Sequence, residues 1–180
     1  MRWFAYAILA YFAVGLQIGL SPFVRYHGAS PNLVLLAVVF IAVNAPRDAA
    51  LIGCFALGFI QDLVTQQQPG LFAFSYGIVA LLVVNTQQVV YKGHPLTHFS
   101  LAMAAGAITA AVIIVHGWVR PPGPRVAVGS VVLPRVRVSA TIELTRVLYT
   151  ALLAPFVLGA LQRAKFAFGF QGGRRKGRAW

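Results

Sequence analysis

The apolar residues of this chain fall into six runs, separated by short segments rich in proline and charged residues. An α-helix needs about 20 mostly apolar residues to cross the hydrocarbon core of a bilayer. Nine of the ten prolines lie between the runs, and only Pro155 lies inside one, where we expect a kink. The pattern predicts an all-α membrane protein, a polytopic bundle of about six transmembrane helices. They are expected at residues 3–20, 33–45, 49–64, 71–90, 99–118 and 140–161, which form one domain, residues 1–161.

The runs at residues 33–45 and 49–64 are short, and the polar segment Asn44–Asp48 joins them. Either they form two short helices with a tight turn, or one of them is re-entrant. A closed polar turn satisfies its own backbone, which favours two helices. The first run resembles a signal peptide, but only Arg2 precedes it and no small-residue cleavage site follows, so we expect a retained helix.

The composition agrees with a membrane protein. Charged residues make up 10% of the 180 residues, whereas a soluble domain carries roughly 25%. The net charge of +12 comes from 15 lysines and arginines against three acids. These basic residues lie between and after the apolar runs, which favours membrane orientation and headgroup contact over nucleic-acid binding.

With six crossings, the distribution of basic residues predicts the orientation. Nine lysines and arginines fall on the side of the termini and five on the other, so both termini are expected in the cytoplasm. Residues 162–180 form a basic tail, expected to be mostly disordered. Its cations are expected to contact anionic lipid. They are Arg163, Lys165, Arg174, Arg175, Lys176 and Arg178.

Residues 119–139 form a loop rich in proline and arginine on the outer side. Two β-branched stretches flank Gly129-Ser130, a pair that suits a tight turn, so a small exposed hairpin is predicted. An isolated hairpin is only marginally stable in water, and this one would need support from the bundle or a partner.

Small residues recur at four-residue spacing in two of the runs. Gly15 and Gly19 form one such step, and Ala102, Gly106 and Ala110 form another. This spacing lets a second helix approach closely. The second helix can belong to the bundle or to a partner, and the sequence leaves both readings open.

Two of the three acids, Asp62 and Glu143, are expected at the outer membrane boundary together with Arg146. An unpaired charge is unfavourable there, so we predict that Asp62 or Glu143 pairs with Arg146. Asp62 lies near a helix C-terminus, where the dipole disfavours an anion. It therefore needs a donor, either Arg146 or the backbone of residues 65–70. The cluster serves as a structural clamp or as a partner or ligand contact.

The sequence contains no recognisable set of residues for covalent catalysis. Cys54 is the single cysteine and is expected to be a small buried hydrophobe. His94 and His98 have ligand-compatible spacing, but Pro95 separates them and no third ligand is near. A nucleophile motif and a nucleotide-binding motif are also lacking. We therefore expect no catalytic residue, no metal, no cofactor and no enzyme activity.

Residues 31–76 resemble the MreD family, which determines rod shape in bacteria. The matching residues are Pro31-Asn32-Leu33-Val34-Leu35-Leu36, then Gly53-x-Phe55-x-x-Gly58-Phe59-x-x-Asp62-Leu63, then Pro69-Gly70-Leu71-x-x-Phe74-Ser75-Tyr76. The first part departs from the family at Gly53-Cys54-Phe55, and Phe59 stands where leucine is common. The long 119–139 segment is not a feature we associate with the family.

The resemblance implies a non-enzymatic scaffold of the cell-elongation machinery in the bacterial inner membrane. It implies an MreC-like single-pass partner, with the RodA–transpeptidase pair and the MreB filament in the same assembly that builds lateral peptidoglycan. It also implies structural or partner-binding roles for Gly53, Gly58, Asp62 and Gly70. The family shares a six-helix plan with the substrate-binding subunits of energy-coupling-factor vitamin transporters. A solute-binding transport subunit is therefore the alternative function.

Overall fold

The computed structural model describes residues 3–25, 29–65, 69–86, 95–119, 127–128, 131–132 and 140–168. These residues form six α-helices and one two-stranded antiparallel hairpin, which agrees with the predicted helical bundle. The elements are α1 (Trp3–Leu20), α2 (Leu33–Asn44), α3 (Arg47–Thr65), α4 (Leu71–Thr86), α5 (Pro95–Val119), β1 (Ala127–Val128), β2 (Val131–Val132) and α6 (Ala140–Phe168).

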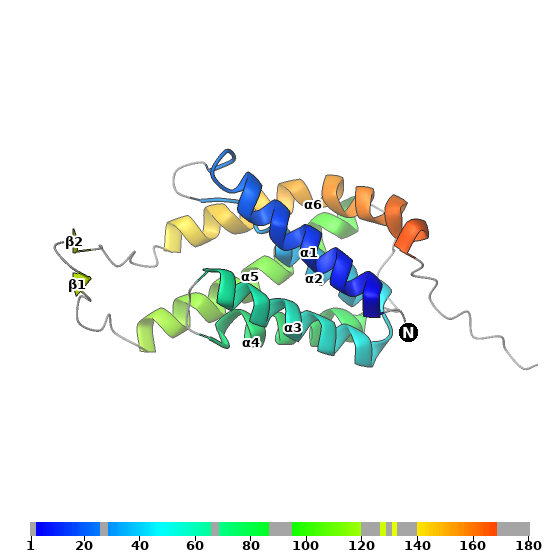
Figure 1. Ribbon diagram of the computed structural model, residues 1–180, viewed down its shortest axis with the longest axis horizontal. Coiled ribbons are helices and arrows are strands. Elements are labelled where there is room, and N and C mark those ends of the chain that lie inside the picture. The colour runs from blue at the N-terminus through cyan, green and yellow to red at the C-terminus, as the bar shows by residue number, and fades with distance from the viewer. Residues whose placement is uncertain are drawn as a thin grey trace, which may run out of the picture.

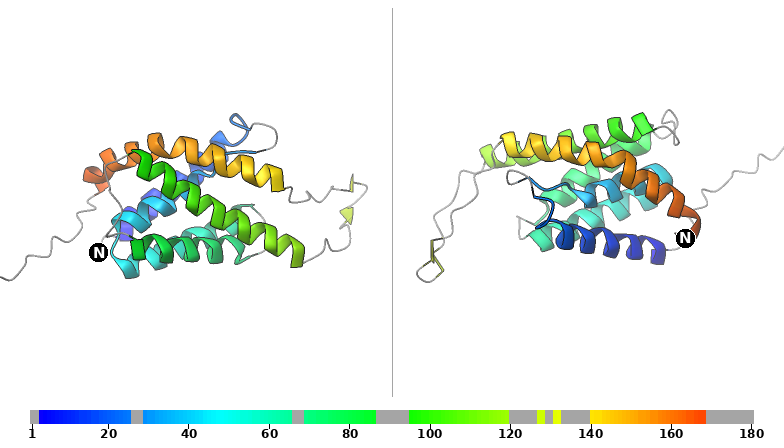
Figure 2. Two further views of the ribbon diagram at one scale, coloured as in Figure 1. Left: turned by 180° about the vertical axis from the view of Figure 1, so that it is seen from behind. Right: turned by 90° about the horizontal axis from the view of Figure 1, so that it is seen from above.

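The helices run in alternating directions along one long axis (Figure 1). The start of α1 and the end of α6 therefore lie at the same end of the bundle, which we call the terminal end. The hairpin lies beyond the opposite end, which we call the hairpin end (Figures 1 and 2). Ala127 pairs with Val132 and Val128 with Val131, which confirms the two predicted strands on either side of residues 129–130.

Helix α2 forms the centre of the bundle. Every residue from Leu33 to Val43 is buried, and all five other helices contact α2. The sequence explains this position, because α2 is apolar around its whole circumference until Asn44. Asn32 caps its first turn by accepting a hydrogen bond from the amide of Leu35 at 3.0 Å.

The outer surface of the bundle is strongly apolar. Large hydrophobic side chains such as Phe55, Leu63, Phe74 and Phe156 are more than half exposed. Three helices, Arg47–Thr65, Leu96–Val119 and Ala140–Arg163, are long and apolar enough to cross a bilayer, and the other three are shorter. Such an apolar exterior is unfavourable in water and is stable when lipid surrounds the bundle.

Two helix bounds differ from the expected ones in a way that matters for function. Helix α6 continues to Phe168, seven residues beyond its predicted end, so Arg163 and Lys165 belong to a helix and the expected disordered tail does not begin at residue 162. Helix α5 begins at Pro95 instead of residue 99, because proline is well tolerated in a first helical turn. Residues 87–90, predicted to end the fourth helix, lie outside the described part.

Helix α6 contains Pro155 and bends along its length (Figure 2). Proline has no amide to donate to the preceding turn, and its ring crowds the carbonyl there. A bend in α6 agrees with the kink expected in this helix.

Candidate functional site

The carboxylate of Asp62 joins the end of α3 to the start of α4. It accepts hydrogen bonds from the backbone amides of Gly70 at 2.9 Å, Phe72 at 2.8 Å and Ala73 at 3.2 Å. The first amides of a helix have no partner within the helix, and the helix dipole favours an anion there. Asp62 is only 1% exposed, so these three donors replace water. Of the two donors that the sequence left open, Arg146 and the backbone of residues 65–70, the structure shows the backbone, with Gly70 from that segment and Phe72 and Ala73 directly after it.

Two glycines make this junction feasible. Gly70 has a φ of +100°, a backbone conformation that glycine adopts without strain. Gly58 lies directly against α4, and a Cβ atom placed there would be 2.5 Å from the Cα of Ala73 and 2.5 Å from the carbonyl oxygen of Phe72. The motif residues Gly58, Asp62 and Gly70 thus meet in one contact between α3 and α4.

The second charged cluster lies on α6. Nη1 of Arg146 donates to Oε1 of Glu143 at 3.0 Å and to Oε2 at 3.3 Å. Glu143 is buried and the Arg146 side chain is 30% exposed. The predicted pairing of Arg146 with an acid is confirmed with Glu143, while Asp62 uses backbone amides instead.

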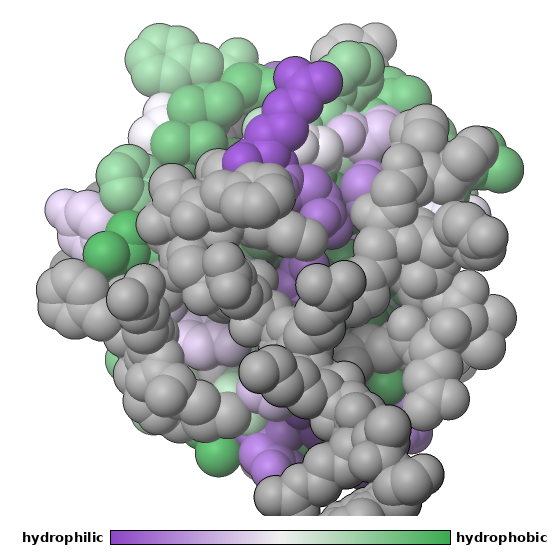
Figure 3. Space-filling model, turned by 90° about the vertical axis from the view of Figure 1, so that its right-hand side faces the viewer, coloured by the Kyte–Doolittle hydropathy of each residue, from purple (hydrophilic) through white to green (hydrophobic). Residues whose placement is uncertain are grey.

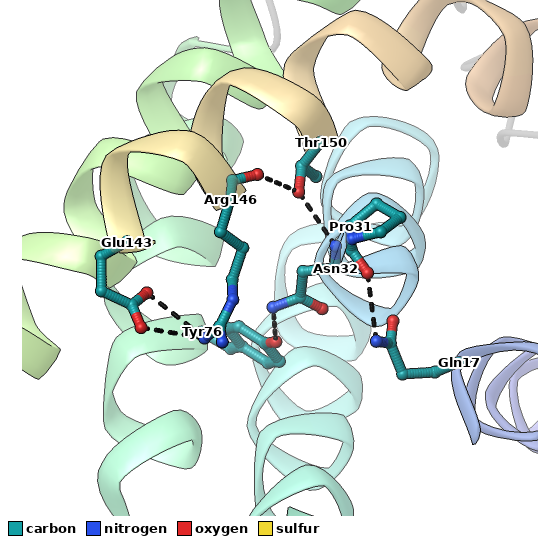
Figure 4. A network of polar contacts seen from close by, with 7 residues as sticks. All are labelled: Gln17, Pro31, Asn32, Tyr76, Glu143, Arg146 and Thr150. Carbon is teal, nitrogen blue, oxygen red and sulfur yellow. Dashed lines mark hydrogen bonds and ion pairs between the residues drawn. The ribbon is translucent and has the colours of Figure 1, made fainter. Parts of the chain in front are cut away.

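A polar network around Asn32 connects three helices near the hairpin end (Figure 4). The backbone amide of Asn32 donates to the hydroxyl of Thr150 at 2.9 Å, and the side-chain Nδ2 of Asn32 donates to the hydroxyl of Tyr76 at 2.9 Å. The Thr150 hydroxyl in turn donates to the carbonyl of Arg146 at 2.7 Å. The start of α2 is thereby tied to α4 and α6.

Gln17 extends this network to α1. Its Nε2 donates to the carbonyl of Pro31 at 3.1 Å, and its Oε1 accepts from the amide of Leu33 at 2.6 Å. Pro31 and Asn32 are buried although they precede the helix. Irregular backbone at membrane depth is stable only where protein satisfies its polar groups, and these side chains do so.

Sequence reasoning gave no site role to the four side chains of this network, although Asn32 and Tyr76 are among the residues that resemble the MreD family. Asn32 stands directly before an apolar run, the position of a helix N-cap. Gln17 is a polar residue inside an otherwise apolar run. Thr150 carries no such signal, because threonine is common in membrane helices.

Tyr76→Phe is expected to lower the free energy of unfolding by about 1–2 kcal/mol, because the buried Nδ2 of Asn32 loses its acceptor. Thermal unfolding of the detergent-purified protein would show the loss. Tyr11→Phe is the matched control, since the Tyr11 side chain is 79% exposed on α1 and should leave the midpoint unchanged. Equal midpoints for the two variants would contradict a stabilising role for this hydrogen bond.

The two small-residue faces have different surroundings. Ala102, Gly106 and Ala110 are buried, and a Cβ atom at Gly106 would lie 2.9 Å from Val147 Cγ1, so α6 already occupies this face. Gly15 and Gly19 on α1 have no neighbour within 4 Å of such an atom. Gly53 makes only ordinary contact with Ile41, at 3.7 Å.

Two small pockets lie among the described residues. One lies beside the network, between Asn32, Gly106, Glu143 and Arg146, and the other lies near the terminal end beside His98. Each has room for about one water molecule. Among the described residues, no three His, Cys, Asp or Glu side chains gather as a metal site would require, and His94 lies outside them.

The remaining predicted lipid-contact residues are only partly described. Arg163 is exposed on α6, and Lys165 lies in the same helix. Arg174, Arg175, Lys176 and Arg178 lie outside the described residues.

Comparison with known proteins identifies the family. The family model of the rod shape-determining protein MreD matches residues 1–157. No curated protein and no solved structure matches the chain. The match covers most of the sequence, including the Asp62 junction, the Asn32 network and the Glu143–Arg146 pair. The chain therefore belongs to the MreD family of rod shape-determining membrane proteins.

Proposed function

We propose that this protein is a non-enzymatic scaffold of the bacterial cell-elongation machinery, which binds an MreC-like single-pass partner through α1. In this role it would help maintain rod shape and lateral peptidoglycan synthesis, together with the RodA–transpeptidase pair and the MreB filament. Family membership supports the link to cell shape. The observation that carries the partner site is the open small-residue face of α1.

Helix α1 has one packed face and one open face. Tyr6, Leu9, Ala13 and Val14 pack against the core, and Gln17 holds the segment before α2. The open face contains the two glycines and several large apolar side chains. It comprises Tyr11, Phe12, Gly15, Leu16, Ile18 and Gly19, all of them exposed.

This open face suits a transmembrane helix as its partner. Glycines four residues apart let two helix backbones approach closely, and apolar side chains on either side extend the contact. The other small-residue face, at Gly106, is already filled by α6. A single-pass helix docked on α1 would therefore disturb no contact inside the bundle.

The proposed topology is multi-pass in the inner membrane, with both termini in the cytoplasm. Its support is that α1 begins and α6 ends at the terminal end, together with the larger number of basic residues assigned to that side. Figure 3 looks at this end and shows hydrophilic residues beside a hydrophobic margin. Arg47, Asp48 and Arg163 are among the exposed residues there. The basic residues from Arg163 to Arg178 would contact anionic lipid.

The vitamin-transport alternative gains no support from the described residues. A small-molecule site needs a cavity of roughly 300 Å³ or more, and the two pockets each hold about one water molecule. We therefore do not propose a solute-binding function.

The experiment is co-purification of an MreC-like protein from a rod-shaped bacterium with the wild-type protein and with Gly15→Leu and Gly19→Leu. Both leucines enter open space, so the bundle should fold normally while the partner is displaced. Gly159→Leu on α6 is the control, because a side chain there also meets nothing within 4 Å.

We expect Gly15→Leu and Gly19→Leu to lose the partner and rod shape, and Gly159→Leu to retain both. Retention of the partner by both α1 variants would refute the α1 site. If the wild-type protein brings down no MreC-like protein under conditions that preserve the bundle, the scaffold proposal itself fails.

A further inference from the structure

The pocket near the terminal end lies between α2, α5 and α6 and combines an apolar wall with two polar side chains. Its lining residues are Val39, Phe40, Val43, His98, Leu101, Leu158 and Gln162. We call it the His98 slot. Neither the family nor the proposed partner site on α1 assigns it a role.

His98 is the unusual member of this slot. Its side chain is 9% exposed, and its Nε2 atom is fully buried with no hydrogen-bond partner in the described part of the chain. A buried polar atom without a partner is unfavourable, and native proteins rarely leave one. His98 lines the slot, so an oxygen atom of a molecule bound there could satisfy the Nε2–H.

The position of the slot along the helices indicates its depth in the membrane. His98 lies one turn inside α5, which begins at Pro95, and Val43 is next to the last residue of α2. Gln162 directly follows the apolar stretch of α6, and the exposed Arg163 comes next. The slot therefore lies where acyl chains meet headgroups.

We propose that the His98 slot binds one acidic phospholipid. Nε2–H of His98 donates to a phosphate or ester oxygen, and Arg163 supplies the attraction for the negative headgroup. The start of an acyl chain lies against Leu101 and Leu158. The slot has room for about one water molecule, so it admits a single oxygen atom of the phosphate–ester region, and the chains of the lipid lie along the apolar exterior. On the proposed orientation this lipid belongs to the inner leaflet.

The test is native mass spectrometry of the full chain in mild detergent, titrated with dioleoylphosphatidylglycerol and, separately, dioleoylphosphatidylcholine. We compare wild type with His98→Leu, Gln162→Leu and Arg163→Gln. Ser100→Ala and Arg47→Gln are the matched controls, because both residues are exposed and neither lines the slot. His98→Leu and Gln162→Leu leave every basic residue of the C-terminal segment in place, so a change in their lipid binding reports on the slot.

We expect wild type and both controls to retain one phosphatidylglycerol preferentially over phosphatidylcholine. His98→Leu should weaken this binding about tenfold, the effect of one hydrogen bond to a charged phosphate. Gln162→Leu keeps the test decisive if the His98 variant fails to fold. Unchanged lipid binding in both slot variants, or no preference for the acidic lipid in wild type, would overturn the proposal. Partner binding is measured separately on α1 and does not depend on this result.

Discussion

Gly58→Ala is expected to destabilise the bundle by about 3 kcal/mol, because the added methyl group has no space. Its Cβ atom would lie 2.5 Å from the Cα of Ala73, 2.5 Å from the Phe72 carbonyl oxygen and 2.7 Å from the amide nitrogen of Ala73. All three atoms belong to the backbone, so no side-chain rotation relieves the contact. Helices α3 and α4 must move apart, which also strains the hydrogen bonds of Asp62.

Thermal unfolding in detergent measures this effect, and Gly53→Ala on the same helix is its control. A Cβ atom at Gly53 meets only Ile41, at an ordinary distance of 3.7 Å. Replacing glycine by alanine within a helix is otherwise favourable by roughly 1 kcal/mol. Gly53→Ala should therefore keep or raise the unfolding midpoint. A Gly58→Ala protein as stable as Gly53→Ala would show that the close approach of α3 and α4 is not required.

Asp62→Ala should also lower the free energy of unfolding by about 3 kcal/mol, because three buried backbone amides lose their acceptor. Asp62→Asn keeps one acceptor oxygen and should give a smaller loss. Asp48→Ala is the control, since Asp48 is an exposed acid in the first turn of the same helix. The interaction of Asp48 with the helix dipole contributes less than about 1 kcal/mol to the free energy of unfolding.

Equal unfolding midpoints for the Asp62 and Asp48 variants would refute the capping role. The comparison also bears on partner binding. A variant of Asp62 or Gly58 that loses a partner has first lost the α3–α4 contact, so only variants at open positions such as Gly15 report on the partner directly.

The helices could be predicted from the sequence because a membrane helix is recognised by the length and apolar composition of its run. The pairing of Glu143 with Arg146 was also predictable, since residues three apart share a helix face. For Asp62, the sequence predicted that the carboxylate needs a hydrogen-bond donor but did not identify the donor. Two of its donors lie in the first turn of the next helix and the third, Gly70, directly precedes that helix, and their positions depend on the close approach at Gly58.

The helix contacts could not be read from the sequence for a physical reason. A membrane helix is apolar on both its lipid side and its protein side, so hydrophobicity does not distinguish the two. The faces at Gly15 and Gly106 have the same spacing, yet one is open and the other holds Val147. The apolar run predicts an end of α6 at residue 161, but the helix continues through Arg163 and Lys165 to Phe168, because arginine and lysine are good helix formers.

The burial of α2 constrains how the protein is made. A helix of 12 residues is about 18 Å long, well short of the hydrocarbon thickness of about 30 Å. The completed bundle tolerates this length because other helices surround α2, but most of them emerge from the ribosome after it. The backbone amide of Asn32 is the last of these groups to find its partner, because its acceptor Thr150 lies on α6. The full set of hydrogen bonds at the start of α2 therefore forms only when α6 packs against it.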